Sequence, residues 1–328
     1  MCGKKLLCFS LLACLVMSSL NVAYSSSAVL IRVDQSGNGD YTKIQDAIDS
    51  VPSNNSVGTF ILLAPGVYSE KIVVPADKPY ITLSGRNAST TIITWNEAWF
   101  NQQSPTVSIL ASDFVGRYLT IQNTFGPNGP AIALRIVGDR AAFYACRFLS
   151  FQDTLLDDSG RHYFKNCYIQ GTTDFIFGNG LSFYEKCHLN SISTNGGAIT
   201  AQRRSSEGEN TGFTFFSCKV TGVGVGTLTL GRPWGAFSRV VFAFSYMSSS
   251  VLPSGWDDWG NSDNQRTAYY GEYRCYGPGS NLSKRVAWSH QLSPPEASPF
   301  ITKAWINGLE WLRPTPTSFI KPPHKGKK

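Results

Sequence analysis

The sequence predicts an all-β protein, a single-domain parallel β-solenoid with one short helix near its amino-terminal end. Three observations support this fold class. The apolar runs are short and are separated by Gly, Asn, Asp and Ser, as in strands joined by turns. Only one segment has a clear helical periodicity, which argues against alternating strands and helices. A short motif then recurs about every 20 residues, a period typical of stacked coils.

The predicted helix comes first along the chain. Its apolar residues follow the i, i+3, i+4, i+7 pattern at Ile44, Ala47, Ile48 and Val51. Thr42 and Gln45 have the spacing of a capping box at its first turn. The strand-like runs that follow are residues 59–63, 72–74, 80–83 and 91–94.

A repeated tripeptide then sets the register of the coils. Cysteine, a polar or aromatic residue and an apolar residue recur at 146–148, 167–169, 187–189 and 218–220. Residues 245–247 offer a further rung without cysteine. Because side chains alternate between the faces of a strand, the cysteine and the apolar residue point the same way. Coils stacked about 4.8 Å apart would align these residues into ladders.

Five cysteines follow the amino-terminal segment: Cys146, Cys167, Cys187, Cys218 and Cys275. We expect the four in the repeat to form an inward-facing apolar ladder. A disulfide between stacked cysteines stays open, because disulfide Cα separations of about 4.4–6.8 Å include the stacking distance. The odd number leaves at least one thiol without an intramolecular partner.

The same register brings two carboxylates together. Asp153 follows Cys146 by seven residues, and Asp174 follows Cys167 by seven. Their Cα atoms should therefore lie about 5 Å apart on one face, with Thr194 at the same offset in the next coil. Two such carboxylates cannot both ionise freely, so their pKa values separate into an acid and a nucleophile or base. The pair alone does not define the reaction, because carboxylates about 5 Å apart also suit a retaining glycosidase.

The ends of the chain differ in composition from the repeats. Residues 1–25 have the charged, apolar and small-residue order of a secretory signal peptide, and their 12-residue apolar run is too short to span a bilayer. We expect residues 26–314 to form the solenoid and residues 315–328 to form a basic, proline-containing tail. The net charge is +7 but only 16% of residues are charged, so we expect no nucleic-acid partner and no membrane partner.

Several segments resemble the signature segments of plant pectin methylesterases. The most specific are Phe-Gln-Asp-Thr-Leu at 151–155, Asp-Phe-Ile-Phe-Gly at 174–178 and Leu-Gly-Arg-Pro-Trp at 230–234. Residues 66–70, 131–135 and 271–273 match further segments. The segments occur in the family's order and span roughly residues 29–313.

The resemblance implies a right-handed parallel β-helix that hydrolyses the methyl esters of polygalacturonate and releases methanol, with no metal or organic cofactor. The implied site residues are Asp174 (nucleophile), Asp153 (general acid and base), Gln152 (oxyanion donor), Arg232 (cation that holds Asp174 and binds substrate), and Trp234, Trp256 and Phe177 (lining of the sugar cleft). It also implies a short form without an inhibitor-like amino-terminal domain. The expected protein is a monomeric glycoprotein secreted to the plant cell wall, with methylesterified pectin as substrate and a pectinesterase inhibitor protein as a partner.

Two positions depart from the family pattern. Pro130 stands where the family usually has a second oxyanion-hole glutamine, and Leu156 stands where many members have an aromatic residue. Two alternatives therefore remain. One is a pectin-binding wall protein with little activity, because proline has neither an amide side chain nor a backbone N–H. The other is a different β-helical carbohydrate enzyme, a polygalacturonase or a pectate lyase, although the sequence lacks a clear acidic calcium cluster.

Overall fold

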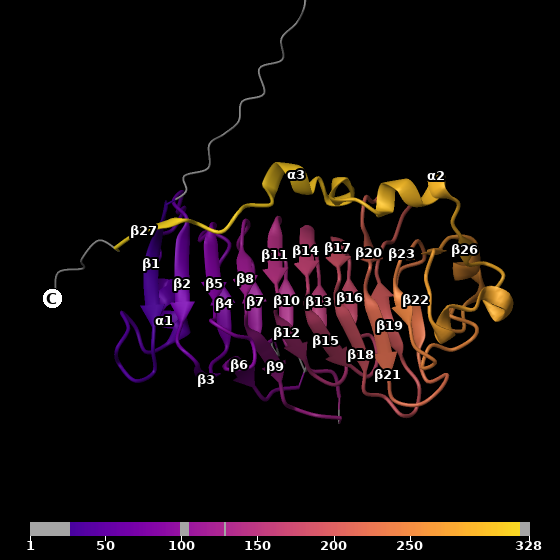
Figure 1. Cartoon of the computed structure of the whole chain (residues 1–328), viewed down its shortest axis with the longest axis horizontal. Coiled ribbons are helices and arrows are strands. Elements are labelled where there is room, and N and C mark those ends of the chain that lie inside the picture. Colours follow the sequence, from indigo (N-terminus) through magenta and orange to yellow (C-terminus); the bar gives the residue numbers. More distant parts are fainter. Residues whose placement is uncertain (1–26, 99–104, 128, 322–328) are drawn as a thin grey trace, which may run out of the picture.

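The chain winds into a right-handed parallel β-helix in which each coil contributes a strand to each of three sheets (Figure 1). The computed structural model describes residues 27–98, 105–127 and 129–321. The predicted fold class is confirmed, and the strand pairs between successive coils are parallel. The expected signal peptide, residues 1–25, lies outside the described residues.

The largest sheet, sheet A, has twelve strands. Across the sheet they are β26 (His290–Gln291), β25 (Tyr269–Tyr273), β23 (Arg239–Ala243), β20 (Gly212–Phe216), β17 (Leu181–Glu185), β14 (Arg161–Lys165), β11 (Ala141–Tyr144), β8 (Val115–Arg117), β5 (Ile81–Ser84), β2 (Thr59–Leu63), β1 (Ser27–Val33) and β27 (Ser318–Ile320).

The other two sheets complete each coil. Sheet B contains β3 (Gly66–Ser69), β6 (Thr91–Trp95), β9 (Thr120–Asn123), β12 (Arg147–Leu149), β15 (Tyr168–Gly171), β18 (His188–Ser191), β21 (Lys219–Gly222) and β24 (Tyr246–Met247). Sheet C contains β4 (Ile72–Val74), β7 (Val107–Ile109), β10 (Leu134–Ile136), β13 (Leu155–Asp157), β16 (Ile176–Gly178), β19 (Ala198–Gln202) and β22 (Thr229–Pro233).

The interior of the coil is filled by side-chain ladders. Sheet A contributes an aromatic stack with successive ring centroids 5.3, 4.4, 4.6 and 4.5 Å apart, formed by Phe143, Phe164, Tyr184, Phe215 and Phe242. The expected cysteine ladder is confirmed, because Cys146, Cys167, Cys187 and Cys218 are buried beside this stack. All five described cysteines are free thiols, which resolves the open question of a disulfide, and burial raises the pKa of the ladder thiols Cys146, Cys167 and Cys187.

Helix α1 (Ile44–Asp49) packs its apolar face at the amino-terminal end, as predicted, but its cap differs. The expected capping box between Thr42 and Gln45 is wrong. The carboxylate of Glu70 accepts hydrogen bonds from the backbone N–H groups of Ile44 and Gln45 at 3.0 and 3.1 Å. The Gln45 side chain instead binds the backbone of Val73. A carboxylate from the next part of the coil therefore satisfies the first-turn donors that a local cap would otherwise bind.

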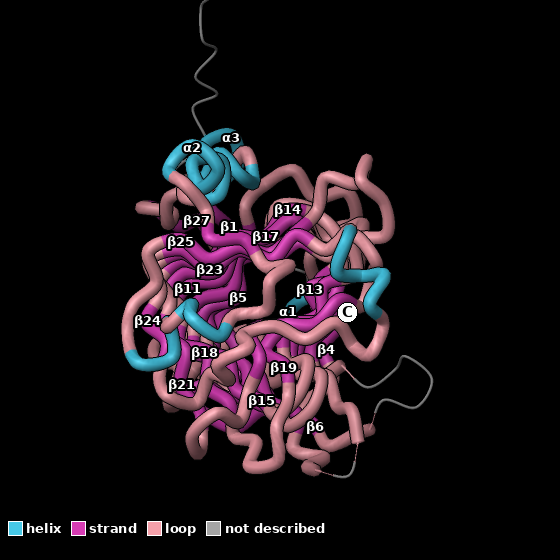
Figure 2. The backbone as a smooth tube through the Cα atoms, turned by 90° about the vertical axis from the view of Figure 1, so that its right-hand side faces the viewer, coloured by secondary structure: helices cyan, strands magenta, loops and turns pink. Residues whose placement is uncertain are grey.

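The carboxy-terminal segment runs back along the outside of sheet A (Figure 1). It contains α2 (Pro294–Ala297) and α3 (Gly308–Trp311), together with 3₁₀ turns at Ser298–Phe300 and Lys303–Ile306. Figure 2, which looks down the long axis, shows α2 and α3 against this one side of the coil. Ile306 and Trp311 pack on outward-facing residues of sheet A.

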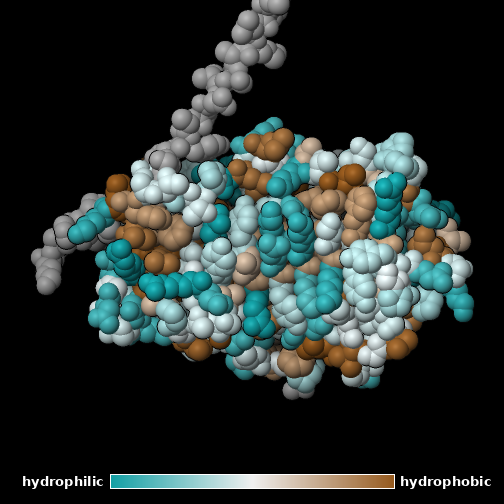
Figure 3. All heavy atoms as spheres, in the orientation of Figure 1, coloured by the Kyte–Doolittle hydropathy of each residue, from teal (hydrophilic) through white to brown (hydrophobic). Residues whose placement is uncertain are grey.

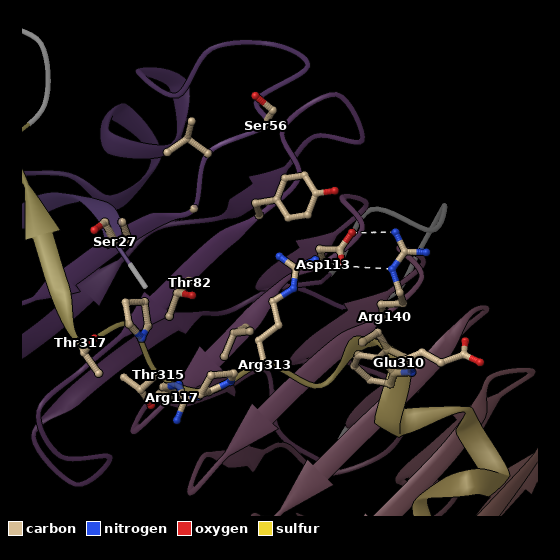
Figure 4. Close-up of a pocket in the computed structure, with 18 of the residues that line it drawn as sticks. Ser27, Ser56, Thr82, Asp113, Arg117, Arg140, Glu310, Arg313, Thr315 and Thr317 are labelled. Carbon is tan, nitrogen blue, oxygen red and sulfur yellow. Dashed lines mark hydrogen bonds and ion pairs between the residues drawn. The ribbon is translucent and has the colours of Figure 1, made fainter. Parts of the chain in front are cut away.

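The last described residues correct the expected domain boundary at 314. Strand β27 pairs in parallel with β1, so part of the expected tail belongs to the sheet. Arg313, just before this strand, donates to Asp113 at 2.7 Å, and Arg140 binds the same carboxylate from the other side (Figure 4). The segment is held because the edge of β1 offers unpaired backbone groups that β27 satisfies.

One face of the molecule is largely polar. Figure 3 shows polar side chains over most of the face in view, with apolar groups confined to separate patches. In the described part of the chain, no helix has the length and apolar character needed to cross a membrane.

Candidate active site

Asp153 and Asp174 occupy equivalent places on adjacent coils. Each lies two residues before a strand of sheet C, and the pairing of Leu155 with Ile176 confirms the predicted 21-residue register. Both aspartates have positive φ angles, 62° and 51°. Asp and Asn adopt this left-handed conformation more readily than most residues, so the turn before each strand accommodates the carboxylates.

The next coil is longer than predicted. Ile176 pairs with Thr200, 24 residues later, and the Asp174 N–H donates to the carbonyl of Ala198 at 2.7 Å. Ala198, and not Thr194, therefore lies beside Asp174. The extra residues form the turn at 193–197, where Ser193 accepts from Asn195 and donates to Gly196.

Arg232 reaches Asp174 from two coils away. It lies in β22 opposite Ala201, which is itself opposite Phe177 of β16. Its Nε donates to Asp174 Oδ1 at 2.8 Å, and its Nη2 contacts Asp174 Oδ2. The side chains of Arg232 and Asp174 are only 14% and 7% exposed. This two-point pairing fixes the orientation of the Asp174 carboxylate more firmly than a single contact would.

The two carboxyl groups differ in their electrostatic environment. Burial and the charge of Asp174 raise the pKa of Asp153 to about 7, against weaker opposition from Arg232 and Gln152. Burial also raises the pKa of Asp174, but the charge and hydrogen bonds of Arg232 oppose that shift. The charge of Asp174 therefore favours the protonated form of Asp153, while Arg232 favours the ionised form of Asp174.

These residues line a small pocket of about 170 Å³ on the outer face of sheet C. The pocket is lined by Gln152, Asp153, Asp174, Phe177, Ala201, Arg232, Trp234 and Trp259. Trp234 is 43% exposed, and its ring centroid lies 5.9 Å from that of Phe177. The pocket thus combines an acid–base pair and a cation with exposed aromatic surface.

Trp256 does not line this pocket, contrary to the expectation. It is 2% exposed, stacks on Tyr270 at 4.4 Å and donates from Nε1 to Glu272 at 3.2 Å. A bridge places it opposite Gly231, where a Cβ would lie 3.3 Å from the indole and only 2.1 Å from the Thr200 hydroxyl. The ring is therefore part of the interior packing.

Trp259, which was not among the predicted site residues, takes the place expected of Trp256. Trp259 is 52% exposed, and the guanidinium of Arg232 lies over its ring. The signal was present as a second tryptophan three residues further on, in Gly-Trp-Asp-Asp-Trp at 255–259. Spacing alone could not tell which of the two indoles faces solvent.

The two departures from the family pattern occupy the expected places. Pro130 forms a parallel bridge with Gln152, so it lies one coil away from that amide. Leu156 packs in a buried apolar cluster with Ile132, Phe177 and Ala201, and the last two of these line the pocket. Pro130 offers no donor towards the pocket, because it lacks both an amide side chain and a backbone N–H.

Metal-ligating side chains do not gather at this site. Across residues 27–98, 105–127 and 129–321, no group of three or more His, Cys, Asp or Glu side chains is arranged to hold a metal ion.

A parallel β-helix with paired carboxylates, an arginine and exposed indoles on one sheet defines a class of carbohydrate-active hydrolase. The model of the pectinesterase family matches residues 30–309. The chain belongs to the pectinesterase family. It is 58% identical over 300 residues to putative pectinesterase 11 of Arabidopsis thaliana, an alignment that covers 91% of this chain and 85% of that protein.

Solved structures agree with this assignment. Pectin methylesterase from carrot superposes with a TM-score of 0.82 at 32% identity, covering 87% of this chain and 94% of that chain. A pectin methylesterase in complex with a hexasaccharide superposes with a TM-score of 0.75 at 26% identity, covering 88% and 98%. The family membership does not favour the polygalacturonase or pectate lyase alternatives.

Proposed function

We propose that this protein hydrolyses the methyl esters of pectin, with Asp174 as nucleophile and Asp153 as general acid and base. The observation that carries the proposal is the buried Asp174, held at both carboxylate oxygens by Arg232 beside an Asp153 whose pKa is raised to about 7. One carboxyl group is thereby prepared to attack and its neighbour to transfer a proton.

The reaction divides into two steps. An ionised Asp174 oxygen attacks the ester carbonyl carbon and forms a tetrahedral intermediate. Its collapse breaks the bond to the methoxy oxygen, which takes the Asp153 proton and leaves as methanol. The resulting acyl-enzyme is an anhydride of Asp174. Asp153, now ionised, removes a proton from water, which attacks the acyl carbon and frees both the substrate carboxylate and Asp174.

Gln152 is the side-chain donor placed to stabilise the oxyanion. It lines the pocket next to Asp153, and removal of one such donor typically lowers turnover about 10²–10³-fold. Pro130, one coil away, supplies no second amide. The oxyanion hole of this chain therefore has the Gln152 donor but no donor from position 130. This feature keeps the weakly active pectin-binding protein as the second candidate function.

The aromatic groups of the pocket suit a sugar polymer. Trp234 and Trp259 are 43% and 52% exposed, and both line the pocket together with Phe177. Aromatic faces pack against the apolar faces of sugar rings, and the guanidinium attracts uronate charge. The related complex with a hexasaccharide supports a polymeric galacturonate as the substrate.

We further propose that the protein acts as a monomer in the plant cell wall and is a target of pectinesterase inhibitor proteins. Support for the location comes from the signal-like residues 1–25 and from membership of a plant pectinesterase family.

The test is methanol release from methylated pectin by the purified mature protein. The wild type should release methanol, and Asp174→Asn should reduce release by at least about 10³-fold while pectin binding is retained. Equal release by this variant would refute the assigned nucleophile. Binding without release by the wild type would favour the weakly active pectin-binding protein.

A further inference from the structure

A second cavity has a volume of about 490 Å³. It is lined by Arg204, Glu207, Phe237, Arg239, Arg266, Thr267, Tyr269 and Phe300. Consecutive residues of the chain contribute to this cavity and to the surroundings of the active-site pocket. Arg203 lays its guanidinium over Trp234 of the active-site pocket, whereas the next residue, Arg204, turns into the second cavity. The volume falls within the range of about 300–1,000 Å³ that is typical of small-molecule sites.

Two arginines of this cavity have only uncharged hydrogen-bond acceptors, although the charge of Arg204 also acts on the nearby carboxylate of Glu209. Arg204 is 7% exposed and donates to three backbone carbonyls, those of Glu207, Glu209 and Phe237. Arg239 donates to the carbonyl of Thr211 and to the side chain of Asn210. Within the described residues, neither guanidinium forms an ion pair. Burial and the charge of Arg204 lower the pKa of Arg239 to about 10, as expected for two neighbouring cations.

The arginines of a larger cavity, of about 740 Å³ beneath the carboxy-terminal segment, are paired differently. There Arg140 and Arg313 share the buried carboxylate of Asp113 (Figure 4). Arg161 pairs with Asp139. Those arginines are neutralised within the protein. In the smaller cavity the hydrogen-bond acceptors are uncharged, so the positive charge remains available to a ligand.

The remaining charged groups of the smaller cavity lie at its rim. Arg266 pairs with Asp263, but both side chains are mostly exposed, at 78% and 74%. Glu207 is exposed, and it is its backbone carbonyl that contacts Arg204. Exposed pairs of this kind contribute little, so they do not cancel the field of the two inner arginines.

We propose that this cavity binds the carboxylate of an unesterified uronic acid residue, with its sugar ring against Tyr269 and Phe237. Guanidinium groups have the fork geometry that matches a carboxylate. Both aromatic side chains are half-buried and line the cavity, where the Tyr269 ring also stacks with His290 and Phe300. The inference rests on the proposed function, because demethylation in the active-site pocket generates the uronate. A partly demethylated chain would thereby gain a second attachment point outside the active-site pocket.

The experiment measures the affinity of trigalacturonate by calorimetry on the mature Asp174→Asn protein, with its active site saturated by the fully methyl-esterified trimer. Arg239→Gln and Arg266→Gln should each weaken trigalacturonate binding, by about tenfold for the inner arginine and less for the rim arginine. The control Arg147→Gln makes the same charge change on sheet B and should alter the affinity less than twofold. Arg266 is exposed, so its variant remains informative if Arg239→Gln does not fold.

Three outcomes would overturn the proposal: unchanged affinity in both variants, equal binding of the esterified trimer in this cavity, or inorganic phosphate binding as tightly as trigalacturonate. Methanol release by the wild type is measured in parallel. Its absence would remove the proposed function without altering the binding result, whereas lost binding with normal release would remove only this inference.

Discussion

Asp153 and Asp174 are chemically identical residues that the fold makes different. Both are buried, but only Asp174 is held by the Arg232 guanidinium at both oxygens. Asp153 instead experiences the charge of its neighbour, and its pKa rises to about 7. The division of labour between nucleophile and acid thus follows from which carboxylate the arginine reaches.

The pH dependence of activity should follow from this difference. Asp153 must hold a proton to release methanol, so kcat/KM for methyl-ester hydrolysis should fall above a pH of about 7. In Asp174→Asn the neighbouring charge is absent, and the pKa of Asp153 should move down, as measured by carboxyl carbon NMR. An unchanged Asp153 pKa in the variant would show that burial alone sets it.

Pro130 is the residue that most directly limits the oxyanion hole. Because it lies opposite Gln152 on the neighbouring coil, Pro130→Gln should place a second amide at the pocket and raise kcat by about tenfold or more. Pro130→Ala is the matched control, since it restores the backbone N–H without an amide side chain. Equal rates in all three proteins would mean that another donor already fills this place.

At the scale of elements, the register of the strands in sheet C sets the spacing of the side chains at the site. Residues at one register position on successive strands form an outward row, in which Leu156, Phe177, Ala201 and Arg232 stand side by side. Coils can differ in length without disturbing this row, because the turns absorb the extra residues. The longer turn after Asp174 changes its neighbour from Thr194 to Ala198 and leaves the strand register intact.

Substitutions of the two tryptophans after β22, Trp256 and Trp259, should have separate effects on protein stability and on pectin binding. Trp256→Ala removes a buried indole and should lower the free energy of unfolding by about 3–5 kcal/mol. Trp259→Ala should change it by less than about 0.5 kcal/mol but raise KM for pectin several-fold. Chemical denaturation and steady-state kinetics measure the two effects. Similar destabilisation by both substitutions would contradict the assignment of Trp259 to the pocket.

For the whole molecule, the carboxy-terminal segment closes the edge of sheet A. It pairs β27 with β1 and brings Arg313 to the buried Asp113. Removal of residues 313–328 should lower the free energy of unfolding by about 1–3 kcal/mol, because Asp113 loses one charged hydrogen-bond donor. Thermal unfolding measures this loss, and removal of residues 322–328 is the control. Methanol release per folded molecule should persist, since sheet C is untouched; its loss would place this segment in the site.

Local sequence patterns determined the repeating architecture. The Cys-x-apolar tripeptides predicted the ladder, and their spacing predicted the neighbouring aspartates, because a strand alternates its faces and coils stack at a fixed height. Those relations need only the chain's own periodicity.

Other features depend on contacts that no local pattern encodes. The tertiary structure decided that Glu70 rather than Thr42 caps α1, that Trp259 rather than Trp256 meets solvent, and that β27 completes the edge of sheet A. It also gave Arg204 and Arg239 backbone carbonyls as hydrogen-bond acceptors in place of carboxylates. In each case the partner comes from another coil or from the far end of the chain. Burial and charge compensation are properties of the folded surroundings, so they are set only when those distant segments meet.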